Sequence, residues 1–111
     1  MMKARESLDE YARRSANDLE NKIIELGPSK VASFVGETVM GQLQGDVPPA
    51  PGYWSYIRKI CDQYDVHLIL DEVYCGLGRS GKVYCCEWDN VVPDFVCFGK
   101  TLGAGYAPLS V

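Results

Sequence analysis

Two short apolar runs, each followed by a charged residue, constrain the fold of this chain most. Residues 68–70 are Leu-Ile-Leu and lead into Asp71, and residues 95–99 (FVCFG) lead into Lys100. Runs this apolar are typical of strands buried on both faces of a parallel sheet. In such sheets, ligands bind beyond the carboxyl ends of the strands. We therefore expect Asp71 and Lys100 to lie near each other at that edge.

The rest of the pattern predicts alternating helices and strands. A long amphipathic helix is predicted over residues 5–26, with a capping box formed by Ser7 and Glu10. Gly27 and Pro28 end this helix. The remaining expected elements are a strand from 31 to 35 that ends near Glu37, a helix over 53–64, and strands over 66–70 and 95–98. This order indicates an α/β fold, a mainly parallel sheet with flanking helices.

Composition limits the classes of partner. The chain has 111 residues and a net charge of −4, which favours neither nucleic acid nor an anionic membrane surface. It contains no apolar run of the roughly 20 residues that span a bilayer, and no apolar stretch typical of a signal peptide follows Met1. Five cysteines and one histidine lack the paired spacing of a zinc site, so we expect no metal. These features suggest an intracellular protein of the cytoplasm or a mitochondrion.

Residues 76–81 (GLGRSG) contain the glycine string of dinucleotide-binding folds, but that string has meaning only between a strand and a helix. Here, Asp71 and the four residues after it separate the string from the strand, and no helical periodicity follows. The same segment resembles a phosphate-binding P-loop, except that Val83 replaces the magnesium-binding Ser or Thr. A P-loop NTPase fragment is therefore the less favoured alternative.

A carboxylate and an amine at one sheet edge suit a site for pyridoxal 5′-phosphate. An amine can hold this cofactor as an imine, while an acid keeps the pyridine nitrogen protonated. The sequence also resembles the class III pyridoxal-phosphate-dependent aminotransferases, which have fold type I. The resemblance rests on residues 34–39 (FVGETV), 68–81 (LILDEVYCGLGRSG), 92–94 (VPD) and 98–109 (FGKTLGAGYAPL).

This resemblance implies roles for four residues. Lys100 would hold the cofactor as an internal aldimine and then move a proton to and from the substrate. Asp71 would bind the pyridine nitrogen, and Val73 would pack against one face of the ring. Glu37 would lie near the substrate carboxylate. Glu72 is expected to point away from Asp71, because successive side chains of a strand alternate.

The resemblance further implies a ping-pong transfer of an amino group from an amino acid or amine to an oxo acid, in a homodimer. Decarboxylases, racemases and aminomutases of fold type I share the same lysine and aspartate. Thr38, Tyr74 and Thr101 depart from the common family pattern, which leaves the substrate open. The phosphate-binding loops of the family have no counterpart here. Residues 1–111 are thus expected to be the central part of a cofactor-binding large domain, incomplete at both ends and inactive alone.

Overall fold

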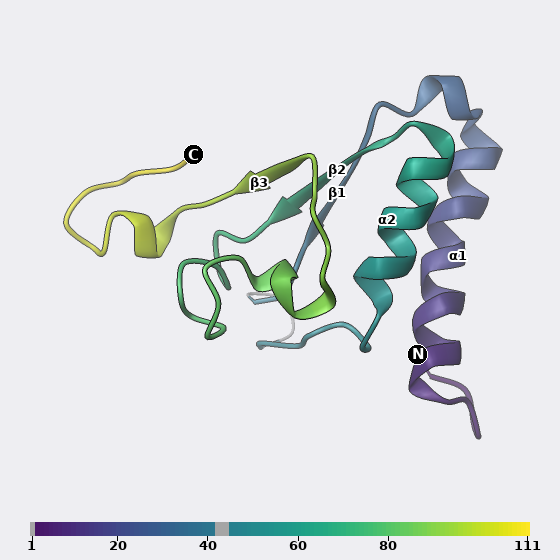
Figure 1. Cartoon of the computed structure of the whole chain (residues 1–111), viewed down its shortest axis with the longest axis horizontal. Helices are drawn as coiled ribbons and strands as arrows, with labels where there is room; N and C mark the ends of the chain where they lie inside the picture. Colours follow the sequence, from purple (N-terminus) through teal and green to yellow (C-terminus); the bar gives the residue numbers. More distant parts are fainter. Residues whose placement is uncertain (1, 42–44) are drawn as a thin grey trace.

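A computed structural model describes residues 2–41 and 45–111, and within them it contains two α-helices and three β-strands (Figure 1). The helices are α1 (Leu8–Leu26) and α2 (Tyr53–Tyr64), and the strands are β1 (Ser33–Glu37), β2 (His67–Asp71) and β3 (Phe95–Cys97). Short 3-10 helices lie at η1 (Pro28–Lys30), η2 (Cys85–Asp89) and η3 (Lys100–Leu102). The α/β order expected from the sequence is confirmed, with boundaries within three residues of those predicted.

The three strands form one parallel sheet in the order β1-β2-β3. Glu37 at the end of β1 is in register with Asp71 at the end of β2, and Asp71 is in register with Cys97 at the end of β3. Because the strands are parallel, all three carboxyl ends meet at one edge of the sheet. Every segment that leaves a strand begins at that edge.

One face of the sheet is covered by α1 and α2, which lie side by side (Figure 1). Leu68 and Leu70 of β2 are completely buried on this face. Fully burying one such side chain contributes about 1.5–3 kcal/mol. The buried side chains that pack with them come mainly from the two helices: Ala16, Ile23, Trp54, Ile57, Ile60 and Cys61.

The opposite face of the sheet is open within the described residues. Val35 of β1 and Phe95 of β3 keep 59% and 58% of their surface exposed. The apolar runs predict burial on both faces, and within the described residues the helices cover one of them. The reason is that side chains alternate along a strand, while both helices lie on the side of Leu68 and Leu70.

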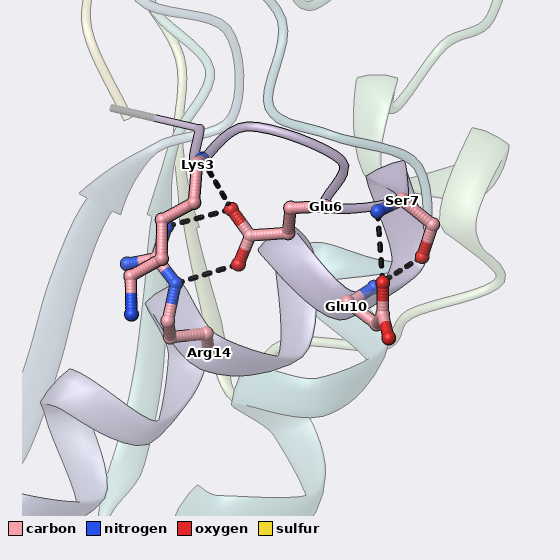
Figure 2. Close-up of polar contacts among 5 residues, drawn as sticks. All are labelled: Lys3, Glu6, Ser7, Glu10 and Arg14. Carbon is pink, nitrogen blue, oxygen red and sulfur yellow. Dashed lines mark hydrogen bonds and ion pairs between the residues drawn. The ribbon is translucent and has the colours of Figure 1, made fainter.

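A cluster of charged hydrogen bonds fixes the start of α1 (Figure 2). The Ser7 backbone N–H donates to Glu10 Oε2 (2.8 Å), and the Glu10 N–H donates to Ser7 Oγ (3.2 Å), so the expected capping box is present. Glu6 accepts from Arg14 Nε at 2.7 Å and from the Lys3 N–H at 2.7 Å. The sequence placed the first residue of the helix slightly too early, since Ser7 is the cap. Among the described residues, neither helix is both long and apolar enough to cross a membrane.

The Glu6 cluster predicts a loss of stability in acid. The hydrogen bond from Arg14, followed by that from Lys3, lowers the pKa of Glu6 from 4.5 to about 2. A lowered folded-state pKa stabilises the fold fully above pH 4.5, and this contribution disappears as the pH falls through 2. Urea unfolding of wild type and Glu6→Gln should therefore differ above pH 5 and converge near pH 2.

The matched control is Glu25→Gln, which removes a carboxylate paired with Lys22 on the exposed side of α1. We expect its difference from wild type to be small at every pH. A Glu6→Gln difference that stays constant from pH 6 to pH 2 would contradict the assignment.

Candidate functional site

Asp71 is the last residue of β2, where the chain leaves the sheet. Its Oδ1 accepts the backbone N–H of Val73 at 2.9 Å, and its carbonyl oxygen accepts the N–H of Thr38 at 3.1 Å. The side chain is half-buried. The carboxylate is therefore held in a turn at the carboxyl edge of the sheet, and within residues 2–41 and 45–111 its second oxygen accepts no hydrogen bond.

Val73 joins this turn to the segment that follows β3. A Cβ atom placed on Gly99 would lie 3.2 Å from Val73 Cγ1, so the absence of a side chain at Gly99 permits close packing. Asp71 is also in register with Cys97, two residues before Gly99. These contacts bring Asp71, Val73 and Gly99, the residue before Lys100, together at the carboxyl edge of the sheet.

Lys100 begins η3 with a backbone φ of +43°. This left-handed conformation is uncommon for a residue with a side chain and costs about 1–3 kcal/mol, and such strain is concentrated at functional sites. The side chain is exposed and lines a hollow of about 740 Å³. The other residues around this hollow are Leu77, Gly78, Arg79, Thr101, Ala104 and Gly105.

Tyr74 lies against the same amine. Lys100 Nζ is 5.0 Å from the centroid of the Tyr74 ring, within the range of a cation–π contact. The Cζ of Arg79 is 5.7 Å from the same centroid. A hydrogen bond to Asp46 raises the pKa of the Tyr74 hydroxyl. The aromatic ring therefore forms one wall beside Lys100, at a position that the sequence marked only as a departure from the family pattern.

Glu37, the fourth predicted site residue, is the last residue of β1. Its Oε2 accepts the N–H of Gly41 at 3.3 Å, and its side chain is exposed. Although its backbone neighbours Asp71 in the sheet, it lines a different hollow of about 530 Å³. That second hollow lies between α1, the end of β1 and the start of α2.

Glu72 is a buried carboxylate whose importance the sequence did not reveal. It is 1% exposed, and its oxygens accept the N–H groups of Cys85 (2.6 Å) and Cys86 (2.8 Å) and the hydroxyl of Thr38 (3.2 Å). The Glu72 side chain is buried whereas that of Asp71 is half-buried, which agrees with the predicted alternation of the two side chains. The only sequence signal was that alternation, since the donors are distant along the chain.

Two buried cysteines near Glu72, Cys75 and Cys86, have raised thiol pKa values. Burial, followed by the charge of Glu72, raises the pKa of Cys86 to about 12. Burial and the neighbouring Cys85 raise the pKa of Cys75 to about 12. All five cysteines are free thiols. Because the thiolate is the reactive form, Cys75 and Cys86 pack as small apolar side chains rather than act as nucleophiles.

The glycine-rich segment at residues 76–81 forms turns and opens no helix. The Leu77 N–H donates to the Val83 carbonyl, and the Gly78 N–H donates to the Lys82 carbonyl. A dinucleotide site requires this string to begin a helix, so that interpretation fails here. The segment instead forms part of the wall beside Lys100.

Comparison with solved structures supports this arrangement of elements. The chain superposes on a thermostable omega transaminase from Pseudomonas jessenii with a TM-score of 0.92 and 39% identity, covering 99% of this chain and 24% of that one. It superposes on an omega-transferase from Vibrio fluvialis with a TM-score of 0.90 and 37% identity, covering 97% of this chain and 25% of that one.

Sequence comparison agrees with the structural match. The chain is 47% identical over 105 residues to an uncharacterized aminotransferase of Schizosaccharomyces pombe, which covers 95% of this chain and 23% of that protein. It is 42% identical over 104 residues to a chloroplastic gamma aminobutyrate transaminase of Solanum lycopersicum, covering 94% of this chain and 20% of that protein. The chain thus spans between a fifth and a quarter of the length of these relatives. The class-III aminotransferase family matches residues 1–111, and the chain belongs to this family.

Proposed function

We propose that this chain carries the cofactor lysine and its partner acid in a pyridoxal-phosphate-dependent transaminase. One observation carries the proposal: Asp71, Val73 and Gly99 lie together at the carboxyl edge of the sheet, and Lys100, the residue after Gly99, lines a hollow of about 740 Å³. The reaction would transfer an amino group from an amino acid or amine to an oxo acid by a ping-pong mechanism.

The residues at this edge fit pyridoxal phosphate chemically. An exposed primary amine, a carboxylate held by a backbone N–H and an aliphatic side chain are the groups that such a ring requires. When bound, the cofactor supplies a protonated ring that withdraws the electron pair released at the substrate Cα. The strained backbone at Lys100 is consistent with a functional residue.

Each residue of the group would have a distinct task. Lys100 Nζ would hold the cofactor covalently and, once released, would carry the proton that leaves the substrate Cα. Asp71 would keep the ring nitrogen protonated through its carboxylate. Val73, fixed against Gly99, would support one face of the ring and exclude water from it.

The substrates would be small molecules with an amine and an oxo group. The relative from Solanum lycopersicum is named for gamma-aminobutyrate, so a donor whose amine lies at the end of a short carboxylate chain is a reasonable first candidate. Glu37 would act in substrate binding only if other parts of a longer protein join its hollow to that of Lys100.

The share of its relatives that the chain covers supports a second part of the proposal. Residues 1–111 would form the central part of a larger cofactor-binding domain, incomplete at both ends. The complete protein would be a homodimer. The open sheet face around Val35 and Phe95 is consistent with further segments that pack there.

Other fold type I enzymes remain candidates within this proposal. A decarboxylase, racemase or aminomutase would use the same Lys100 and Asp71, and analysis of the products would separate them from a transaminase. A P-loop NTPase fragment would instead be stabilised by magnesium-ATP and not by pyridoxal phosphate.

The lysine assignment can be tested in the longest polypeptide that contains this chain. With pyridoxal phosphate the wild type should be yellow, and borohydride should fix the cofactor to the peptide that contains Lys100. Lys100→Ala should lose both the colour and the fixation, because Lys100 supplies the amine that lines the hollow. Absorbance and peptide mass spectrometry measure the two results.

Lys82→Ala is the matched control, since Lys82 lies in the neighbouring loop and rests on the Trp88 ring. It should keep both the colour and the fixed peptide. Persistent colour in Lys100→Ala would defeat the assignment.

A second prediction concerns residues 1–111 alone. A ligand that binds only the folded state, at 100 times its Kd, stabilises a protein by about 2.7 kcal/mol. We expect the longer polypeptide to gain this stability from pyridoxal phosphate in a thermal-shift assay. The isolated chain should gain far less and transaminate at no measurable rate, because its site lacks the family's phosphate loops. Turnover by the isolated chain at the rate of the longer polypeptide would refute this.

A further inference from the structure

The buried Glu72 carboxylate lies between two segments that are far apart in the sequence. It accepts the Thr38 hydroxyl (3.2 Å) from the end of β1 and the N–H groups of Cys85 (2.6 Å) and Cys86 (2.8 Å) from the start of η2. A carboxylate at 1% exposure is costly unless donors compensate for its lost water. Three donors at these distances provide that compensation.

The backbone of Glu72 is fixed as firmly as its side chain. Its N–H donates to the carbonyl of Cys97 at the end of β3 (3.0 Å), and its carbonyl accepts the N–H of Gly76 (2.8 Å). Through its side chain and backbone, this one residue therefore contacts the ends of both neighbouring strands. Because it follows Asp71 directly, it determines how the chain turns away from β2.

Thr38 closes a small network around the same turn. Its hydroxyl donates to Glu72, its N–H donates to the carbonyl of Asp71 (3.1 Å), and its carbonyl accepts the indole N–H of Trp54 (3.1 Å). Thr38 is 3% exposed. The peptide after Asp71 is thus held from the β1 side by Thr38 and from the β3 side by Cys97.

We propose that Glu72 is a positioning residue. Because its own side chain is anchored in the interior, the carboxylate of the preceding residue, Asp71, is held toward the cofactor site. The Glu72 side chain is buried against Thr38, Cys85 and Cys86, whereas the half-buried Asp71 side chain accepts the Val73 N–H instead. The Asp71–Val73 hydrogen bond of 2.9 Å depends on that arrangement. The role toward the cofactor rests on the function proposed above, whereas the tether itself can be measured without cofactor.

Hydrogen exchange of the Val73 amide tests the tether in the cofactor-free, longest polypeptide that contains this chain. In Glu72→Gln, an NH₂ group takes the place of one carboxylate oxygen. At least one of the three groups that donate to Glu72 then loses its acceptor. We expect Val73 exchange to rise roughly tenfold or more relative to that of Ile57, in the core of α2. Exchange at Ile57 reports loss of overall stability. The ratio of the Val73 exchange rate to the Ile57 exchange rate therefore isolates the change in the Asp71–Val73 hydrogen bond.

Two further variants sharpen the result. Glu87→Gln is the matched control, because exposed Glu87 accepts one backbone N–H, that of Tyr84 (2.9 Å), within the same loop region. It should leave the ratio unchanged. Thr38→Val removes one donor and should raise the ratio in the same direction by a smaller factor, which decides the question if Glu72→Gln does not fold. An unchanged ratio in every variant that folds would overturn the proposal.

Cofactor titration separates this inference from the proposed function. If Glu72 positions Asp71, Glu72→Gln should raise the Kd for pyridoxal phosphate roughly tenfold or more, while borohydride still fixes the cofactor to Lys100. Equal affinity in wild type and Glu72→Gln would overturn the positioning role alone. A wild type that binds no pyridoxal phosphate would instead refute the proposed function, and Val73 exchange would still decide the tether.

Discussion

Parallel pairing of the three strands is the constraint on which the rest of this structure depends. Because the strands are parallel, the carboxyl ends of β1, β2 and β3 lie at one edge of the sheet. Asp71 and the segment leading to Lys100 are neighbours at this edge. Neither residue is unusual in itself. A carboxylate in a turn and a lysine after a strand are common, and in the proposed function only their shared edge would make them a chemical pair.

Much of the fold could be predicted because local signals agreed with one another. The Ser7–Glu10 capping box, Gly27 at the end of α1 and the helical spacing of α2 all placed elements within a few residues of their observed bounds. The apolar runs before Asp71 and Lys100 predicted the strands and their shared edge. The motifs along residues 34–109 indicated the family, to which the chain belongs.

Other features depend on contacts between distant segments, which no local pattern records. The donors to Glu72 come from 13, 14 and 34 residues away, so a single sequence shows only a second acid after Asp71. Glu37 lines a different hollow from Lys100, and its carboxylate accepts the N–H of Gly41. The open sheet face reflects where both helices pack, and the apolar composition of the strands does not record which face they cover.

The protonation state of a bound pyridine nitrogen tests the account most directly, because it reports whether Asp71 reaches a ring held by Lys100. Pyridoxal phosphate labelled with ¹⁵N in the ring can be bound to the longest polypeptide that contains this chain and observed by NMR. We expect the chemical shift of a protonated nitrogen in wild type and that of an unprotonated nitrogen in Asp71→Ala. An unprotonated nitrogen in wild type, or the same shift in both proteins, would contradict the pairing of Asp71 and Lys100 around one cofactor.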